Sequence, residues 1–395
     1  MVILAGLFVA TSVALLGPFV SDLVSLARLR SRPARAPERP GGLPRFVFLV
    51  PAYNEELLIE ECVASLRAQR YPRDRFEIVV IADNCTDRTA PLARGAGATC
   101  LERNDPAHPG KPQAVSWALK QLPANADAVV IIDADTVVDT DFASVLARLA
   151  PLREKAIQVR NGVSNPNENA ITRMAAVLAS AKFEYALPLR RMAGLNVPLG
   201  AGSCIGTGVL ERHGWQALSI GEDLEMYAML TVLGVEIDLA REARLFAQEA
   251  RSLKQVSSQR RRWTAGRLMV LRQYFTRILR SRAIGPHQKL DIITELSTPG
   301  PVVHLGIVLV MTIAGLAVHL PWWILGLAWV SLIRPVGYAL IALWRMPGRW
   351  RTLAAFLYLP IYGAWRLAVE ATALLRIGEK SWIRTARHLP GRTVQ

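Results

Sequence analysis

The sequence is poor in cysteine and histidine, the residue types from which zinc sites and disulfide frameworks are built. It has four cysteines and six histidines in 395 residues. Cys62, Cys85, Cys100 and Cys204 lie far apart and form no CxxC pair. The sequence therefore indicates neither a structural zinc site nor a disulfide scaffold, and we expect reduced thiols.

Acidic residues are also scarce: 32 Asp and Glu stand against 47 Lys and Arg, which gives a formal net charge of +15. Residues 251–290 contain eleven Lys or Arg and no Asp or Glu. On electrostatics alone, such a block suits nucleic acid, anionic lipid headgroups or phosphate-bearing substrates. No part of the chain resembles a nucleic-acid-binding module, so we do not expect a nucleic-acid partner.

Long hydrophobic runs are present and predict a membrane protein. Residues 2–20 are uncharged and long enough to span a bilayer. The arginines after this run predict that the following chain is cytoplasmic. Residues 299–320 and 322–344 predict a helical hairpin, in which the intramembrane Arg334 should face a partner rather than lipid. The uncharged stretch 352–365 is short and contains a proline, so we expect it to be re-entrant or interfacial.

The middle of the chain alternates short apolar runs with amphipathic stretches. Residues 46–50, 76–82 and 127–133 predict buried parallel strands. The stretches between them predict helices at residues 55–69, 86–97 and 111–122, the last with Pro112 in its first turn. This order predicts a doubly wound α/β sheet.

Polar residues follow each predicted strand: "PAYNEE", then "DNCTD", then "DAD". Ligands of such sheets bind beyond the carboxyl ends of the strands, so these clusters should converge. Asp133 and Asp135 are separated by one small residue, and two neighbouring carboxylates repel each other unless a cation is near. Mg²⁺ or Mn²⁺ bound through carboxylates and a substrate diphosphate fits this pattern.

Six motifs, in this order, resemble those of membrane-bound family 2 glycosyltransferases, a group that includes the synthases of cellulose, chitin, hyaluronan and poly-N-acetylglucosamine. They are "PAYNE", "ADNCTDRT", "GK" at 110–111, "DAD", "GED" at 221–223 and "QRRRW" at 259–263. The resemblance covers roughly residues 46–265. It implies a GT-A type, Rossmann-like α/β catalytic domain with N- and C-terminal transmembrane helices and a cytoplasmic interfacial helix.

The resemblance also implies roles for particular residues. Asp223 would be the general base, and Asp135 would ligate the metal. The donor-binding residues would be Tyr53, Glu55, Asp83, Lys111, Asp133, Gln259 and Arg262. The acceptor-binding residues would be Trp263, Gly202, Cys204 and Glu222. The sequence departs from the family at Gly221, where Ser or Thr is more usual.

Residues 263–282 predict a basic amphipathic helix in the membrane interface, with an apolar face of Leu268, Leu271, Phe275, Ile278 and Leu279. Arg260 and Arg261 match no part of the QxxRW motif and are predicted to face lipid. The expected organisation is an anchor at 1–27, a basic Pro-rich linker at 28–45, the catalytic domain at 46–255, the QxxRW and interfacial segment at 256–298, the hairpin at 299–344, and a re-entrant or interfacial segment with a basic tail at 345–395.

The function implied is an inverting transfer from a UDP-sugar, with Mg²⁺ or Mn²⁺, at the cytoplasmic face of the cell membrane. The favoured acceptor is a growing polysaccharide, and the alternative is a membrane lipid. Three firm membrane helices are few for a polymer channel, so export would need a homo-oligomer or a partner. A non-catalytic membrane scaffold or nucleotide sensor is the hypothesis from another class.

Overall fold

The computed structural model describes residues 2–29, 42–123 and 125–375, and the chain divides into two units. Among the described residues, the sheet unit comprises residues 42–165 and 197–250. The helical unit comprises residues 2–29, 166–196 and 251–375. Most of the expected linker (residues 30–41) and most of the expected tail (residues 376–395) lie outside the described residues.

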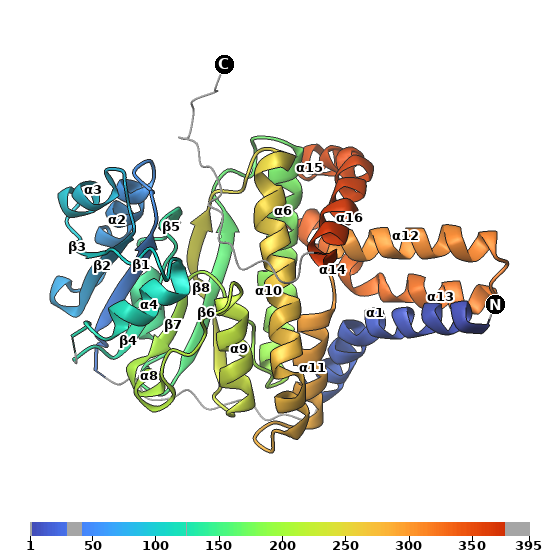
Figure 1. Ribbon diagram of the computed structural model, residues 1–395, viewed down its shortest axis with the longest axis horizontal. Helices are drawn as coiled ribbons and strands as arrows, with labels where there is room; N and C mark the ends of the chain where they lie inside the picture. The colour runs from blue at the N-terminus through green and yellow to red at the C-terminus, as the bar shows by residue number, and fades with distance from the viewer. Residues whose placement is uncertain (1, 30–41, 124, 376–395) are drawn as a thin grey trace. The chain divides into compact units, whose positions relative to one another are not determined.

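The sheet unit contains an eight-stranded mixed sheet in the order β3-β2-β1-β4-β7-β6-β8-β5 (Figure 1). β1 is parallel to β2 and β4, β2 is parallel to β3, and β6 is parallel to β8, whereas β7 and β5 are antiparallel to their neighbours. The strands are β1 (Phe46–Ala52), β2 (Phe76–Asp83), β3 (Thr99–Arg103), β4 (Ala128–Ile131), β5 (Thr136–Val138), β6 (Ala156–Val163), β7 (Ser203–Gly206) and β8 (Ile237–Ala247).

The three predicted strands are β1, β2 and β4, and their side chains alternate between two apolar layers. Phe46 and Phe48 pack on one face of β1 in the core that includes α2 (Ile59–Arg67). Val47 and Leu49 pack on the other face in the core that includes α4 (Lys111–Leu119). Burial on both faces is what a continuous apolar run produces in a parallel sheet. The GT-A-like α/β fold is confirmed.

The predicted helices of this unit are present but shorter than expected. α2 begins at Ile59 rather than at residue 55, and α3 (Thr89–Gly95) also lies inside its predicted range. The other helices of the unit are α5 (Phe142–Ala147), α8 (Thr207–His213) and α9 (Glu222–Val232). A short 3₁₀ turn, η1 (Arg73–Arg75), precedes β2. α4 carries Pro112 in its first turn, as predicted.

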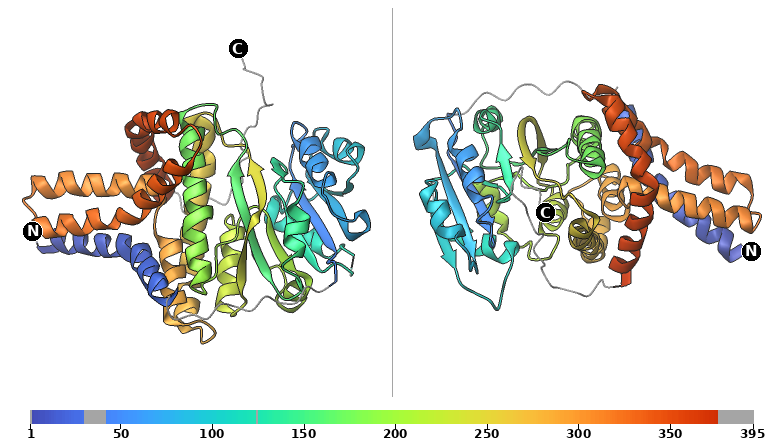
Figure 2. Two further views of the ribbon diagram at one scale, coloured as in Figure 1. Left: turned by 180° about the vertical axis from the view of Figure 1, so that it is seen from behind. Right: turned by 90° about the horizontal axis from the view of Figure 1, so that it is seen from above.

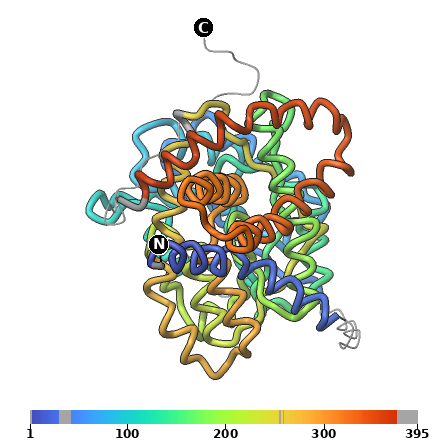
Figure 3. The backbone as a smooth tube through the Cα atoms, turned by 90° about the vertical axis from the view of Figure 1, so that its right-hand side faces the viewer, coloured from blue at the N-terminus to red at the C-terminus, as the bar shows by residue number. Residues whose placement is uncertain are grey.

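The helical unit is built from α1, α6, α7 and α10–α16, with short η segments between some of them (Figures 1 and 2). α1 packs against α13, and α12 packs against α16 (Figure 3). The bounds are α1 (Val2–Leu29), α6 (Ala170–Ser180), η2 (Ala181–Ala186), α7 (Leu187–Met192), α10 (Leu253–Arg280), α11 (Pro286–Ser297), α12 (Pro301–Ala317), α13 (Trp322–Ser331), α14 (Ile333–Arg345), α15 (Arg349–Ala355), η3 (Phe356–Tyr358) and α16 (Leu359–Leu375).

Three helical stretches are long and apolar enough to cross a membrane: Ile3–Leu29, Trp322–Arg345 and Arg349–Ala373. Their outer side chains are apolar and exposed, for example Trp322 at 83% and Leu357 at 85%, so they need a non-aqueous surrounding.

Two of the predicted membrane segments have different bounds in the structure, and how they lie in a membrane stays a prediction. The expected span at 299–320 is the 17-residue α12, which follows α11 after an 80° bend. The expected re-entrant segment at 352–365 belongs to a longer helical stretch, because Pro360 lies in the first turn of α16 and does not interrupt a helix.

The predicted catalytic domain at 46–255 is not continuous in space, because residues 166–196 belong to the helical unit. In that unit, Val177 of α6 and Ala181 of η2 pack against Ala342 and Leu343 of α14. Apolar side chains on one side of this segment therefore explain why it belongs to the helical unit.

The prediction of a single exposed apolar face on α10 is wrong. Ile278 is fully buried, with Val270 and Tyr274, because α10 packs against α11 and α16, whereas Phe275 and Leu279 are exposed. One part of the expected apolar face is therefore buried against other helices, and the other part is exposed. The guanidinium of Arg260 lies 4.5 Å from the centre of the Trp263 ring, and the expectation that Arg260 faces lipid stays a prediction.

The prediction that Arg334 faces a partner is confirmed. Arg334 Nε donates to Asp22 Oδ2 of α1 at 2.8 Å, and the Tyr338 hydroxyl donates to the same oxygen at 2.8 Å. An ion pair with a neighbouring helix is the usual way to hold a charge at this depth.

Candidate active site

The loops that follow β1 and β2 are tied together by side-chain hydrogen bonds at the carboxyl edge of the sheet. The Thr86 N–H donates to Asn54 Oδ1 at 2.8 Å, and the Glu55 N–H donates to Thr89 Oγ1 at 2.8 Å. Asn54 and Asn84 both have left-handed backbone angles, with φ of 55° and 52°. Asparagine tolerates this conformation better than most residues. Tyr53 and Glu55 belong to the first of these two hydrogen-bonded loops, the one that follows β1.

Lys111 lies at the centre of a cluster of carboxylates in the sheet unit. Its Nζ is 2.9 Å from Asp133 Oδ1, 3.1 Å from Glu222 Oε1 and 3.7 Å from Asp223 Oδ1. Lys111 opens α4, Asp133 follows β4, and Glu222 and Asp223 open α9. Four of the residues predicted for the site therefore converge although more than 100 positions separate the first from the last.

The loop before α4 aims Lys111 at these carboxylates. Gly110 has φ +110°, a conformation that side-chain-bearing residues rarely adopt, and its N–H donates to Asp83 Oδ2 at 3.1 Å. Pro112 then fixes the first helical turn. The helix therefore starts at a defined point, and the lysine follows it directly.

The charges of the cluster shift two pKa values in a useful direction. Burial raises the pKa of Asp223 to about 7, with Glu222 and Asp133 adding to the rise and Lys111 opposing it. Burial alone would lower the pKa of Lys111, but Asp133, Asp223 and Glu222 together hold it well above its usual value. A lysine that stays charged beside a carboxyl that titrates near neutrality can serve anion binding and proton transfer together.

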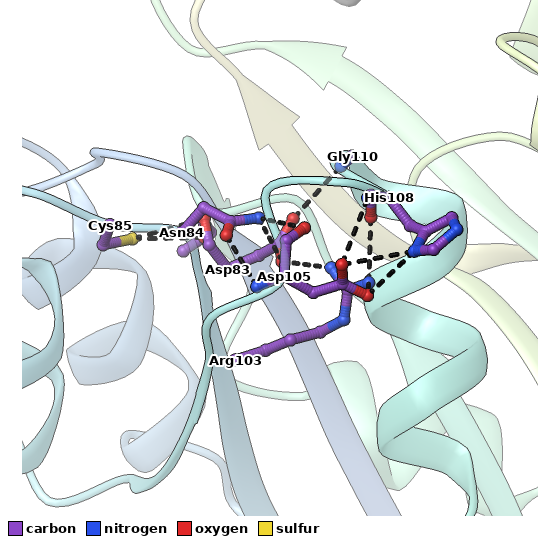
Figure 4. A network of polar contacts seen from close by, with 8 residues as sticks. Asp83, Asn84, Cys85, Arg103, Asp105, His108 and Gly110 are labelled. Carbon is purple, nitrogen blue, oxygen red and sulfur yellow. Dashed lines mark hydrogen bonds and ion pairs between the residues drawn. The ribbon is translucent and has the colours of Figure 1, made fainter.

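Asp83, a predicted nucleoside contact, is buried in a network that supports this loop (Figure 4). The side chain of Arg103 donates to Asp83 Oδ1, to Asp105 Oδ2 and to the carbonyl oxygen of His108. With the Gly110 contact, Asp83 thus joins the end of β2 to the chain just before Lys111. Arg103 was not predicted as part of the site. It ends β3, a strand that was also not predicted, and a predicted strand at this position would have placed Arg103 at the same edge of the sheet.

The residues after β4 suit a divalent cation that is shared with a substrate. Asp133 and Asp135 are both partly exposed, and Thr136 Oγ1 donates to Asp135 Oδ1 at 3.3 Å. The described residues contain no cluster of three or more His, Cys, Asp or Glu that could enclose a metal by itself. Mg²⁺ and Mn²⁺ commonly use one or two carboxylates and complete their shell with phosphate oxygens and water, so this donor set fits.

Gly202 and Cys204, two of the predicted acceptor contacts, lie in the packed interior of the sheet unit. Gly202 has φ +76°, and a Cβ there would lie 2.3 Å from Leu245 and 2.4 Å from Val159. Cys204 lies in the central strand β7 with 1% exposure, and burial raises its pKa to about 12. Both residues therefore contribute to sheet packing, and their role as acceptor contacts stays a prediction. Glu222, the third predicted acceptor contact in this unit, is paired with Lys111.

Gln259, Arg262 and Trp263 lie in α10 of the helical unit. Gln259 and Arg262 are partly exposed, and Trp263 is 46% exposed. An exposed indole offers a flat apolar face, which suits a sugar ring or the membrane interface.

Comparison with known proteins gives a consistent result. Residues 44–266 match the family model described as "Glycosyltransferase like family 2". The chain is 27% identical over 271 residues to the beta-monoglucosyldiacylglycerol synthase of Nostoc sp., covering 66% of this chain and 57% of that protein. It is 26% identical over 256 residues to the poly-beta-1,6-N-acetyl-D-glucosamine synthase of Staphylococcus aureus, covering 59% and 57%. The chain thus spans a little over half the length of these relatives.

Among solved structures, the mannosyltransferase PcManGT from Pyrobaculum calidifontis, in complex with GDP-Man and Mn²⁺, is similar to the chain with a TM-score of 0.57. The identity is 23%, and the match covers 94% of this chain and all of that chain. At this identity, the likeness supports the fold described above.

Proposed function

The chain belongs to glycosyltransferase family 2, and from this membership we propose that it transfers a sugar from a UDP-sugar, with inversion, to an acceptor held at the membrane. The observation that carries the proposal is the meeting of Lys111 with Asp133, Glu222 and Asp223 at the edge of the sheet. It puts a cation for a diphosphate beside a carboxyl group whose pKa suits a base.

In this mechanism Asp223 accepts the proton of the acceptor hydroxyl, whose oxygen forms the new bond to the anomeric carbon. The bond between that carbon and the diphosphate oxygen breaks, and UDP leaves with the electron pair. Lys111 binds the diphosphate as a point charge, and Asp133 contacts the nucleotide. Asp133 and Asp135 would hold Mg²⁺ or Mn²⁺, which supplies positive charge to the leaving diphosphate.

The remaining roles follow from the family motifs. Tyr53, Glu55 and Asp83 would contact the nucleoside, and Asp83 also binds Arg103 and the Gly110 N–H before Lys111. In the helical unit, Gln259 and Arg262 would bind the donor diphosphate, and Trp263 would stack on the acceptor sugar.

For the acceptor, we favour a membrane lipid over the growing polysaccharide that the sequence motifs favoured. Three described helices meet the length and composition of a membrane span, or four if α11 and α12 count as one bent span. So few helices cannot enclose a polymer path alone, whereas a lipid acceptor needs none. Polysaccharide synthesis stays the second candidate because Trp263 is exposed as a sugar platform, and it would require a homo-oligomer or an export partner.

We further propose that the chain crosses the cell membrane several times, with the sheet unit in the cytoplasm. The basic residues after α1 support this orientation through the positive-inside rule. A scaffold or sensor role is disfavoured because such a protein has no need of a half-buried lysine surrounded by three carboxylates.

A panel of radiolabelled UDP-sugars tests the proposal, with GDP-mannose included and Mn²⁺ present. Label in the organic phase identifies a lipid acceptor, and label in high-mass aqueous product identifies a polymer. Lys120→Met, an exposed lysine change at the end of α4, is the matched control for Lys111→Met. If no donor yields product or free nucleotide with wild-type protein in lipid, the enzymatic proposal fails.

A further inference from the structure

The helical unit contains a second charged cluster, made by α10 and α16, for which the transferase mechanism has no use. Its members are Arg260 and Arg267 of α10 and Arg366 and Glu370 of α16; we call it the α10–α16 arginine cluster. Arg366 and Glu370 are each only 8% exposed, and Arg366 Nη2 donates to Glu370 Oε1 at 3.1 Å. The charges of Arg260 and Arg267 also act on Arg366.

The cluster carries more positive than negative charge. The carboxylate of Glu370 acts on both Arg366 and Arg267, and the guanidinium of Arg260 adds a further positive charge near Arg366. Glu295 also acts on Arg267, but it is ion-paired with Arg190. A purely structural network would be expected to pair its buried charges, because an uncompensated buried cation is costly. The excess of charge therefore points to an anion from outside the chain.

Several polar atoms of the cluster are buried and have no hydrogen-bond partner among the described residues. They include Arg366 Nη1, Arg267 Nε and the nearby Thr298 Oγ1, and also the acceptor atom Glu370 Oε2. Buried polar atoms are nearly always paired, so unmet ones indicate a missing water, ion or ligand. The unsatisfied guanidinium donors of the two arginines would bind anionic oxygens, and the unsatisfied carboxylate oxygen of Glu370 would accept a hydrogen bond from a hydroxyl group.

The surroundings fit the headgroup level of a membrane. Arg366 and Glu370 lie near the carboxyl end of the candidate span Arg349–Ala373. The guanidinium of Arg260 lies against Trp263, which is 46% exposed. Tryptophan and arginine together are typical of the membrane–water boundary, where the ring contacts acyl chains and the cation contacts phosphate.

We propose that the α10–α16 arginine cluster binds the headgroup of an anionic membrane lipid, with the phosphate at the arginines and a headgroup hydroxyl at Glu370. A phosphate diester that carries a free hydroxyl, as in phosphatidylglycerol, supplies both kinds of oxygen. The lipid is a ligand of the helical unit, and its binding does not depend on which acceptor the transferase uses.

Native mass spectrometry of the full chain, released from micelles with equal phosphatidylglycerol and phosphatidylcholine of matched acyl chains, tests this. We expect wild-type protein to retain phosphatidylglycerol preferentially. Arg366→Gln should weaken that retention roughly tenfold or more, as the loss of a charge-assisted hydrogen bond does. Arg280→Gln removes the same charge from an exposed position of α10 and should keep it.

Equal retention of the two lipids, or equal loss in both variants, overturns the proposal. Arg267→Gln serves as a second test if the thermal unfolding of Arg366→Gln shows that it does not fold. Displacement of the lipid by millimolar inorganic phosphate would assign the site to a soluble phosphate, and displacement by UDP would assign it to the donor; either result excludes the lipid. No sugar donor or metal is present, so failure here leaves the transferase proposal intact.

Discussion

Replacing Lys111 by methionine, which is of similar length but uncharged, should destabilise the sheet unit even in the absence of substrate. The variant leaves Asp133, Glu222 and Asp223 close together with no cation between them. Asp133 follows β4, whereas Glu222 and Asp223 open α9, so repulsion between them acts directly against the closure of this edge of the sheet.

The magnitude follows from the distances. At an effective dielectric constant near 20, unit charges that are about 3 to 4 Å apart attract by roughly 4 to 6 kcal/mol. Desolvation of the charges offsets part of this, and removing one partner of a buried pair typically costs about 3 to 5 kcal/mol. The three carboxylates keep 13% to 36% side-chain exposure. We therefore expect a loss of about 3 kcal/mol, or roughly 6 to 12 °C in the unfolding midpoint.

Thermal unfolding in detergent at pH 8 measures this, with Lys120→Met as the control for loss of one lysine from α4. The deficit of the Lys111 variant should shrink as the pH falls to 5. Burial raises the pKa of Asp223, and removal of Lys111, which opposes that rise, should raise it further. The folded variant therefore takes up a proton before the unfolded chain does, and it loses stability as the pH rises. An unfolding midpoint within 1 °C of that of the control at pH 8 would refute the reasoning.

Four further changes test separate parts of the proposal. Asp223→Asn should lower kcat by a factor of roughly 10² to 10⁴ with little change in donor KM. The kcat/KM of the wild-type protein should rise with pH through about 7, because only the ionised carboxylate of Asp223 accepts a proton. A fall in kcat/KM between pH 6 and 8 would contradict this. Asp135→Asn should raise the Mn²⁺ concentration for half-maximal activity by at least the roughly 10- to 100-fold that loss of a supporting residue costs, and an unchanged metal titration would exclude it as a ligand. Trp263→Ala should raise acceptor KM roughly threefold to tenfold, and an equal rise in donor KM would rule out stacking on the acceptor. Arg334→Gln should cost about 3 kcal/mol in thermal unfolding by leaving Asp22 unpaired, and adding Asp22→Asn should recover part of it; no recovery would show that the pair is not the cause.

The residues of the candidate site were predictable because the ends of buried strands can be identified in a sequence. β1, β2 and β4 are short runs of buried apolar residues, and the polar motifs follow them directly. Parallel strands bring their carboxyl ends to one edge, so Asp83 and Asp133 had to share an edge of the sheet. Lys111 could be added because Gly110 and Pro112 mark a helix start.

Other parts were not predictable, because they depend on contacts between distant segments. Gly202 looks the same in a sequence whether it lines a sugar site or lets Leu245 and Val159 pack closely. The apolar face of α10 could not be divided into buried Ile278 and exposed Phe275 without knowing that α11 and α16 cover one side. Hydrophobic periodicity identifies an apolar face, but it does not identify what covers that face.

The charge state of the site is the property that is hardest to predict from the sequence, and it bears most directly on function. The sequence shows which charged residues the motifs "GK", "DAD" and "GED" contain. The rise in the pKa of Asp223 to about 7, however, comes from its burial near Glu222 and Asp133 in the folded chain. Placing three half-buried carboxylates around one lysine is poor design for stability alone, since apolar side chains of similar volume are often as stable or more so. The arrangement is explained if the lysine's charge is needed for a diphosphate and the poised carboxyl for a proton. The instability expected of Lys111→Met and the rise of activity with pH through 7 are therefore two consequences of one electrostatic arrangement, and they should be observed together.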